Sequence, residues 1–240
     1  MCGRWAHLEL LRLGARIEVF LHCVGPSADP SADPSDDLVL RLAGVAEAAY
    51  AITPRTAARL QPDAGAGALL SLARIPRWDA SVLQRPGADL VLVADGIGYA
   101  GNLGTLIRTA DGCGAAAVVL TGATARITHR RVFLASRGTV LTLPVLVRPD
   151  AGRAREELEW LGFRCHVADP AAALAYHQAD FRHGRTAVVV GSERTGVGAG
   201  WRTPDLARIS IPMLGRADSL NVAVSAAVLL AEVRRQRAPG

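Results

Sequence analysis

Five polar side chains in three separated stretches are the candidates for chemistry in this chain. Each stretch ends a predicted strand and runs into a polar or glycine-bearing loop, which is where α/β proteins place ligands. An arginine in such a loop can hold an anion in a two-pronged hydrogen-bonded fork, whereas amides and hydroxyls can orient a ligand or cap a helix. The five residues are Asn102, Arg108, Glu193, Ser219 and Asn221.

Local structure offers a simpler explanation for most of these residues. Asn102 and Ser219 each stand where the N-cap of a predicted helix belongs, so both side chains could serve only as caps. Asn221 lies just inside the second of these helices and is a poor helix former. Arg108, in the second turn of the first helix, is either a solvated surface residue or a buried anion-binding fork.

Two glycine-rich stretches resemble nucleotide-binding loops, and neither is complete. The stretch Gly96–Gly101 matches the dinucleotide pattern G-x-G-x-x-G, but that pattern needs a carboxylate about twenty residues further on. No acidic residue occurs between Asp111 and Asp150. The stretch Gly191–Gly196 lacks the Lys-Ser/Thr pair of a phosphate-binding P-loop. Nicotinamide and nucleoside-triphosphate chemistry are therefore disfavoured.

Composition permits a polyanionic partner without establishing one. All 27 basic residues are Arg, which a GC-rich genome would explain. Residues 1–85 carry nine Arg and nine acidic residues, whereas residues 86–240 carry eighteen and thirteen. The excess of positive charge is thus mild and confined to the later part of the chain.

The cysteines and histidines argue against a metal. The four Cys form no Cys-x-x-Cys pair and have no His at ligand spacing, so they are expected to be buried thiols in a reducing compartment. No basic and apolar leader opens the chain, and the apolar run within 222–231 is too short to cross a bilayer. We expect a soluble, cytoplasmic protein with no bound metal and no membrane association.

The periodicity of apolar residues divides the chain into two α/β regions. Residues 1–70 predict a small unit with helices at 5–13, 37–48 and after Pro54, and strands at 16–23 and 49–52. A twice-repeated Ser-Ala-Asp-Pro within it predicts a solvated loop. Residues 71–88 are expected to form a linker.

Residues 89–240 predict strands at 90–94, 116–120, 142–147, 164–168, 186–190 and 208–211, with helices at 103–113, 130–137, 151–161 and 219–235. Continuous apolar strands between helices predict a parallel sheet covered on both faces.

The order of motifs resembles the SpoU branch of the SPOUT methyltransferases. The matching stretches, which span about residues 89–236, are Asn102-x-Gly104-x-x-x-Arg108-Thr109-Ala110, Val190-Gly191-Ser192-Glu193, and Ile211-Pro212-Met213 followed by Ser219-Leu220-Asn221-Val222. The stretches 72–77 and 131–138 are most similar to the thiostrepton and nosiheptide resistance enzymes. Those enzymes methylate the ribose 2′-hydroxyl of an adenosine in 23S ribosomal RNA.

The resemblance implies a trefoil-knotted α/β catalytic domain at 89–240, an obligate homodimer and S-adenosylmethionine as the methyl donor. It also implies that residues 1–70 form a shortened L30e-like domain that recognises RNA. Carried over by position, the cofactor-binding residues are Gly191, Ser192, Ile211, Met213, Leu220 and Arg137. The catalytic group is Asn102, Arg108, Glu193, Ser219 and Asn221. Arg126, Arg130 and Arg131 are expected to bind RNA, with Arg130 and Arg137 on one helix face.

The chemistry implied is methyl transfer to a weak nucleophile. A ribose hydroxyl must be aligned for in-line displacement and must lose its proton. A guanidinium is a poor proton acceptor, so Arg108 is expected to hold a phosphate or stabilise the developing alkoxide. Two alternatives stay open, since residues 1–85 carry no net charge. One is methylation of a small molecule in natural-product biosynthesis, and the other is an RNA-binding protein without turnover.

Overall fold

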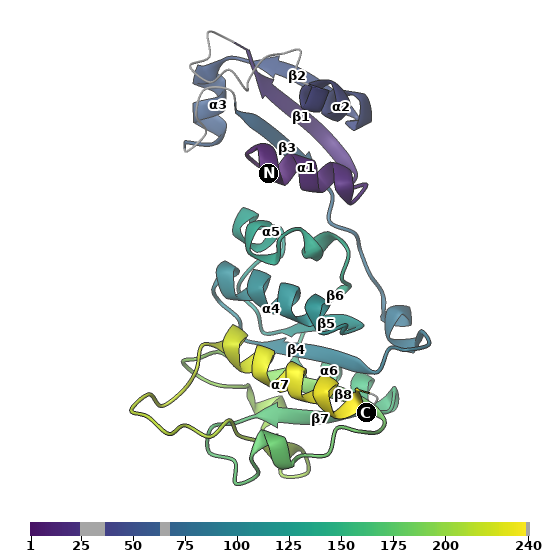
Figure 1. Ribbon diagram of the computed structural model, residues 1–240, viewed down its shortest axis with the longest axis vertical. Coiled ribbons are helices and arrows are strands. Elements are labelled where there is room, and N and C mark those ends of the chain that lie inside the picture. Colours follow the sequence, from purple (N-terminus) through teal and green to yellow (C-terminus); the bar gives the residue numbers. More distant parts are fainter. Residues whose placement is uncertain (25–36, 63–67, 239–240) are drawn as a thin grey trace. The chain divides into compact units, whose positions relative to one another are not determined.

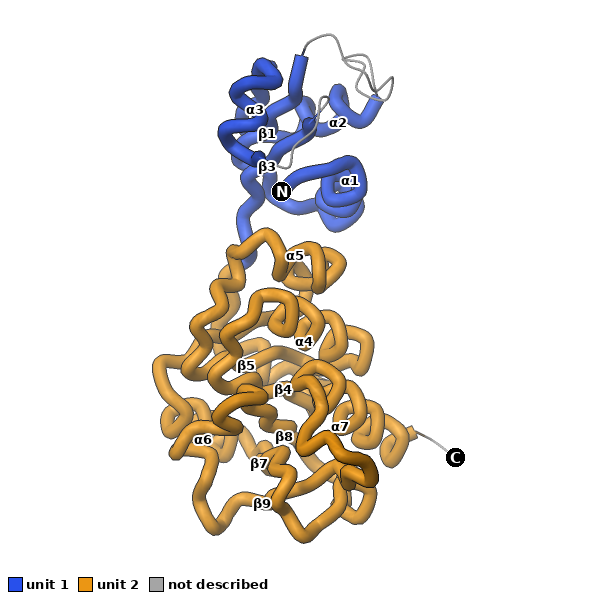
Figure 2. Tube along the Cα trace, turned by 90° about the vertical axis from the view of Figure 1, so that its left-hand side faces the viewer, with its two compact units in different colours: residues 1–76 blue, residues 77–240 orange. Residues whose placement is uncertain are grey.

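The computed structural model describes residues 1–24, 37–62 and 68–238, which divide into two compact units (Figure 2). The first unit comprises residues 1–76 and the second residues 77–240. The predicted Ser-Ala-Asp-Pro loop lies outside the described residues. Within the part of the chain that the structure describes, every helix is too short or too polar to cross a membrane.

In its described residues, the first unit is a three-stranded sheet with three α-helices. Its strand order is β2-β1-β3, with β1 parallel to β2 and antiparallel to β3. Its elements in chain order are α1 Arg4–Arg12, β1 Ile17–Cys23, α2 Asp37–Val45, β2 Ala48–Ile52, α3 Pro54–Leu60 and β3 Leu69–Ala73. The strand β3 was not predicted, and the predicted boundary at residue 70 falls inside it. Its five residues are too few for periodicity to distinguish a strand from a helix.

The second unit contains a six-stranded sheet in the order β6-β5-β4-β8-β7-β9 (Figure 1). All of its neighbouring strands are parallel, which confirms the predicted parallel α/β architecture. The strands are β4 Leu90–Asp95, β5 Ala117–Thr121, β6 Val145–Arg148, β7 Phe163–Ala168, β8 Arg185–Val190 and β9 Ala207–Ile209. The carboxyl ends of these strands meet at one edge of the sheet, where parallel sheets bind ligands.

Helices cover both faces of this sheet. Every residue of β4 and β5 is buried, as expected for strands between two helical layers. Val91 and Val93 of β4 pack in one core cluster with Leu158 of α6, so by alternation Leu92 faces the opposite layer. In that layer α4 packs against α5 and α7. The α-helices are α4 Ala100–Gly112, α5 Arg130–Ser136, α6 Ala151–Trp160 and α7 Val222–Arg237, and the 3₁₀ turns are η2 Ala80–Gln84, η3 Thr139–Leu141, η4 Tyr176–Gln178 and η5 Ala199–Trp201.

Three helix ends differ from the sequence prediction. Helix α4 begins at Ala100 with Tyr99 as N-cap, so Asn102 lies in the first turn and does not cap it. Helix α7 begins at Val222, and its N-cap is Asn221 rather than Ser219. Helix α5 ends at Ser136, because Arg137 adopts a left-handed conformation with φ 53°. The prediction that Arg130 and Arg137 share a helix face is therefore wrong.

The contact between α4 and α5 depends on a glycine in α4. A Cβ placed on Gly104 would lie 2.6 Å from the carbonyl oxygen of Val132 and 2.7 Å from Cβ of Ala135. Both distances are shorter than a van der Waals contact, so a side chain at this position would push the helices apart.

We expect Gly104→Ala to lower the free energy of unfolding by about 1–3 kcal/mol through overpacking. Gly112→Ala, in the same helix, is the matched control, because an added Cβ there meets no atom within 4 Å. Alanine is the better helix former, so this control should be neutral or stabilising by up to about 1 kcal/mol. Urea unfolding measures both values, and equal stability of the two variants would contradict the close packing of α4 on α5.

Candidate active site

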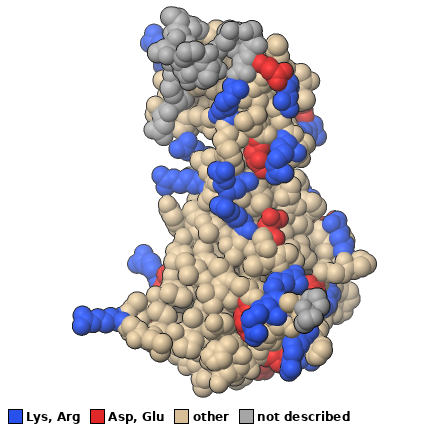
Figure 3. All heavy atoms as spheres, viewed as in Figure 1, with Lys and Arg blue, Asp and Glu red and all other residues tan. Residues whose placement is uncertain are grey.

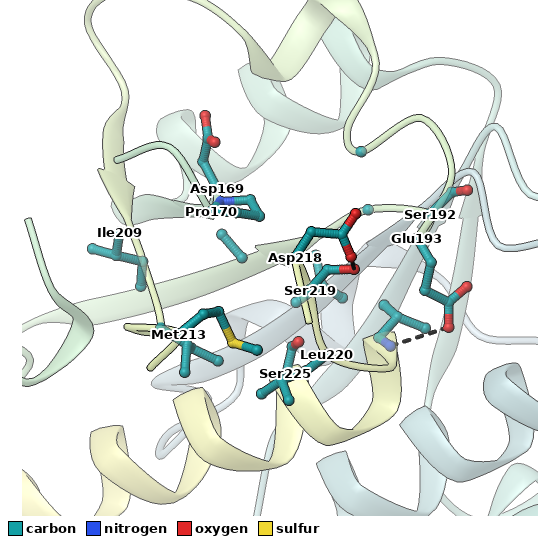
Figure 4. A pocket seen from close by; sticks show the side chains of 16 residues that line it. Asp169, Pro170, Ser192, Glu193, Ile209, Met213, Asp218, Ser219, Leu220 and Ser225 are labelled. Carbon is teal, nitrogen blue, oxygen red and sulfur yellow. Dashed lines mark hydrogen bonds between the residues drawn. The ribbon is translucent and has the colours of Figure 1, made fainter. Parts of the chain in front are cut away.

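A cavity of about 240 Å³ opens at the carboxyl edge of the second unit's sheet. Its walls come from the loops after β7, β8 and β9 and from the first turn of α7. Figure 4 shows Ser192 and Glu193 at one end of the cavity and Asp169 and Ile209 toward the other. Segments that are distant in the chain therefore form one site.

The carboxylate of Glu193 joins the loop after β8 to the starts of α4 and α7. Its Oε1 accepts hydrogen bonds from Nδ2 of Asn102 at 2.9 Å, from Nδ2 of Asn221 at 2.9 Å and from the backbone N–H of Val222 at 3.2 Å. Asn221 Nδ2 also donates to Oδ1 of Asn102 at 3.1 Å. Hydrogen bonds to an ionised group are stronger than neutral ones, so this cluster fixes the starts of α4 and α7 beside the loop after β8.

Asn221 has a second role as the N-cap of α7. Its Oδ1 accepts from the backbone N–H of Ala223 at 3.0 Å, while its Nδ2 points to the carboxylate. One side chain therefore starts the helix and completes the polar cluster. The negative charge of Glu193 also lies at the positive end of the α7 dipole, which is a favourable position for an anion.

Glycine allows the loop that carries Glu193 to fold back on itself. A Cβ on Gly191 would lie 2.3 Å from the carbonyl carbon of Gly196, so only glycine fits there. Ser192 and Gly196 exchange backbone hydrogen bonds of 3.1 and 2.8 Å across the turn. The glycines that resembled a P-loop in the sequence thus serve close backbone packing.

A buried carboxylate anchors the far end of the same loop. Asp95, at the end of β4, is 6% exposed. Its two oxygens accept from Oγ1 of Thr121 and from the backbone N–H of Gly198, each at 2.6 Å. Both oxygens are therefore satisfied, as a buried carboxylate requires. A carboxylate in the interior of the sheet therefore fixes the loop at the rim of the cavity.

Most of the predicted site residues meet at this cavity. Five of the six predicted cofactor-binding residues line it, and these are Gly191, Ser192, Ile211, Met213 and Leu220. Of the predicted catalytic residues, Glu193 and Ser219 line the cavity, while Asn102 and Asn221 are hydrogen-bonded to Glu193. Ser219 Oγ donates to Oδ1 of the neighbouring Asp218 at 3.4 Å.

The predicted arginines lie elsewhere. Arg108 is exposed on α4, and within the described residues its side chain forms no hydrogen bond or ion pair. Arg137 is exposed at the end of α5 and is not part of the cavity wall. Arg126 and Arg131 line a separate hollow beside the start of α4, and Arg130 is the first residue of α5.

Two carboxylates of the cavity were missed in the sequence. Asp169 directly follows β7 and forms an ion pair with Arg208, and Asp218 precedes Ser219 in the loop before α7. The position of Asp169 at the carboxyl end of a predicted strand was a signal that could have identified it. With Glu193, three carboxylates border a cavity whose other walls include Ile211, Met213 and Leu220. Such a cavity suits a ligand with apolar surface and positive charge.

The donor set of the site does not suit a metal ion. In the stretches 1–24, 37–62 and 68–238, no group of three or more His, Cys, Asp or Glu side chains is placed to hold one. Cys23 and Cys165 are buried, whereas Cys2 and Cys113 are partly exposed. Burial raises the pKa of the Cys165 thiol to about 12, so it stays protonated and unreactive at neutral pH.

Comparison with known proteins assigns the second unit to a family. Residues 89–231 match the SpoU rRNA Methylase family, and the chain belongs to it. Over 147 residues it is 32% identical to the 23S rRNA (uridine(2479)-2′-O)-methyltransferase of Streptomyces viridochromogenes, covering 58% of this chain and 50% of that protein. Over 152 residues it is 35% identical to the 23S rRNA (adenosine(1067)-2′-O)-methyltransferase of Streptomyces laurentii, covering 62% and 54%. The chain thus spans about half the length of these curated relatives.

The fold extends the likeness over both units. The crystal structure of the SpoU methyltransferase AviRb from Streptomyces viridochromogenes, in complex with AdoMet, aligns with a TM-score of 0.83 and 24% identity. The alignment covers 99% of this chain and 89% of that one. The six-stranded parallel sheet and its helices are therefore the fold of a SpoU methyltransferase.

We expect Asn221→Ala to lower the free energy of unfolding by about 1 kcal/mol, because α7 loses its N-cap. Asn221→Ser lacks the amide that donates to Glu193 but keeps a capping oxygen. Because the cap is retained, this variant should lose clearly less stability than Asn221→Ala. Urea unfolding followed by circular dichroism measures both variants. Equal losses would show that the contact with Glu193, rather than the cap, provides the stability.

Proposed function

We propose that the chain is an S-adenosylmethionine-dependent methyltransferase that acts on a ribose 2′-hydroxyl of 23S ribosomal RNA. The observation that carries the proposal is the Glu193 cluster, in which residues of all three SpoU-like motifs meet at the edge of one cavity. The names of the curated relatives support both the ribose position and the RNA.

The cavity suits the proposed cofactor. S-adenosylmethionine carries a sulfonium and an ammonium group, and it supplies an electrophilic methyl group. Glu193 and Asp218 offer negative charge to these cations, whereas the charge of Asp169 is shared with its ion-pair partner Arg208. Ile211 and Met213 offer apolar surface to the adenine. The AdoMet complex of the structurally similar AviRb supports the same assignment.

The polar residues then have distinct tasks. Asn102 and Asn221 are held by Glu193, so their amides keep fixed orientations at the rim where the acceptor must arrive. Ser219 offers a hydroxyl to the cavity. In the transfer, the ribose oxygen forms a bond to the methyl carbon while the carbon–sulfur bond breaks, and the hydroxyl proton passes to solvent or to a phosphate of the RNA. Fixed dipoles favour this step because they need no reorganisation.

We assign Arg108 to the acceptor rather than to the cofactor. Its guanidinium is exposed and lies outside the cavity wall, so it is available to an incoming anion. A protonated guanidinium can hold a phosphate or stabilise an alkoxide but is a poor base. We also propose that the RNA contacts Arg137 at the end of α5 and Arg126, Arg130 and Arg131 before it. Figure 3 shows basic side chains spread over one face of the molecule with acidic ones among them.

The proposal also includes a knotted catalytic domain, a homodimer and an RNA-recognition module. From the edge strand β9 the chain returns past the loop after β8 to α7, which packs against α4. This path supports a trefoil knot formed around the cavity. Leu214, which is 99% exposed, and Val224 of α7 place apolar surface near the site and support a homodimer. Residues 1–70 are proposed to be an L30e-like module that recognises the RNA, joined to the catalytic domain at 89–240 by the segment 71–88.

The test is to supply labelled S-adenosylmethionine with 23S ribosomal RNA, with bulk tRNA and with a pool of small metabolites. We expect label in 23S ribosomal RNA, on a ribose, and mapping of the modified nucleotide then tests the predicted adenosine. The relatives act on uridine and on adenosine, so either nucleoside is compatible with the family. Label in a small metabolite alone would favour the second candidate, which the balanced charge of residues 1–85 supports.

We expect Arg108→Ala to reduce methyl transfer to RNA at least about a hundredfold, as for the loss of one contact to a transition state. Its affinity for S-adenosylmethionine and its elution as a dimer should match those of the unchanged protein. Arg153→Ala, an exposed arginine on α6 away from the cavity, serves as the control. Turnover within a few-fold of normal in Arg108→Ala would show that this arginine takes no part in the reaction.

A further inference from the structure

A second hollow, of about 570 Å³, lies at the same edge of the sheet. It is formed by the loops after β4 and β5, next to the strand whose following loop carries Glu193. Its wall contains one aromatic ring, two arginines, two threonines and a histidine, and no acidic residue. These side chains belong to Tyr99, Thr124, Arg126, Thr128, His129 and Arg131.

The aromatic ring of the hollow is exposed and packs against a glycine. Tyr99 is 57% exposed, although it is the N-cap of α4 and its carbonyl oxygen accepts from the backbone N–H of Leu103. The ring lies against the backbone of Gly101, where a Cβ would be 2.5 Å from Cε1 of the tyrosine. The ring is therefore open to solvent and packs on a position where any side chain would displace it.

The arginines of the hollow are available to a ligand. Within the described residues, neither Arg126 nor Arg131 uses its guanidinium in a hydrogen bond or an ion pair. Two uncommitted guanidinium groups beside hydroxyl donors form a surface for phosphate. An exposed aromatic ring beside phosphate-binding groups is the combination that recognises an unpaired nucleotide, because every base can stack on a ring.

We propose that this hollow binds one unpaired nucleotide of the acceptor RNA, with its base stacked on Tyr99 and its phosphate held by Arg126 and Arg131. The inference rests on the proposed function and specifies how the RNA is recognised. Tyr99 and Asn102 are one helical turn apart, roughly 5 Å along α4. A nucleotide in the hollow therefore lies one turn of helix from the Glu193 cluster, where the ribose hydroxyl must be presented.

The test compares Tyr99→Ala with Tyr99→Phe in the full chain. Two quantities are measured for each variant: the KM for methylation of a 23S ribosomal RNA transcript, and the Kd for a fluorescent single-stranded oligoribonucleotide. Loss of one base–aromatic stack should weaken both by roughly fivefold to a hundredfold in Tyr99→Ala. Tyr99→Phe keeps the ring and should stay close to the unchanged protein, and the Kd for S-adenosylmethionine should not change in either variant.

Trp160→Ala is the matched control, because this residue is 80% exposed at the end of α6 and lies outside the hollow. Equal RNA affinity and KM in Tyr99→Ala and the unchanged protein would overturn the inference while leaving the proposed function intact. An equal loss in Tyr99→Phe would also overturn it, since the hydroxyl and not the ring would then make the contact.

Failure of the proposed function gives a different result. If the unchanged protein methylates no RNA, the function proposed above fails, and the oligoribonucleotide affinities still decide the stacking site. A weaker Kd in Tyr99→Ala alone would then support a nucleotide site without methyl transfer. An unchanged Kd would overturn both proposals.

Discussion

The arrangement of the site depends on one carboxylate oxygen, Oε1 of Glu193. It accepts hydrogen bonds from Asn102, Asn221 and the backbone of Val222, which belong to the first turn of α4 and the start of α7. With three donors, this carboxylate oxygen has its hydrogen bonds satisfied within the protein. Without the carboxylate, each donor would have to form its hydrogen bond with water instead. The oxygen therefore fixes two helix starts against one loop, and the cavity wall follows from that constraint.

The loop that presents Glu193 needs support from both sides. At one end, Gly191 brings the backbone against Gly196, which leaves no space for a side chain. At the other end, the buried carboxylate of Asp95 accepts from the backbone of Gly198. Burying a charge without partners is costly, so Asp95 holds the loop only because Thr121 satisfies its second oxygen. Interior packing and rim geometry are thus parts of one hydrogen-bonded structure.

Sequence patterns predicted the sheet well and the helix ends poorly, for a physical reason. Continuous apolar runs such as 90–94 and 187–190 can be buried only between two layers, so the parallel sheet follows from the residues. A helix start depends on which of several capping residues finds a partner. Ser219 and Asn221 are both good caps, and Asn221 caps α7 because its amide can also reach Glu193 across the fold. The strand β3 was missed because five residues are too few for periodicity to distinguish a strand from a helix, and only its pairing with β1 defines it.

The same distinction explains which site residues the sequence could reveal. Motif order grouped Asn102, Glu193 and Asn221, but their meeting at one oxygen depends on the packing of α4, α7 and the loop after β8. The position of Asp169 after a strand is visible in the sequence, whereas Tyr99 gains its arginine neighbours only when the loop after β5 folds beside it. The resulting edge is divided by charge: the loops after β7, β8 and β9 bring carboxylates and apolar side chains to one cavity, and those after β4 and β5 bring arginines and an aromatic ring to a hollow. The cavity on one side of the Glu193 cluster would attract a cation, and the hollow on the other side would attract a polyanion. The electrostatics of this edge therefore favours bringing a cationic methyl donor and an anionic acceptor together at the cluster.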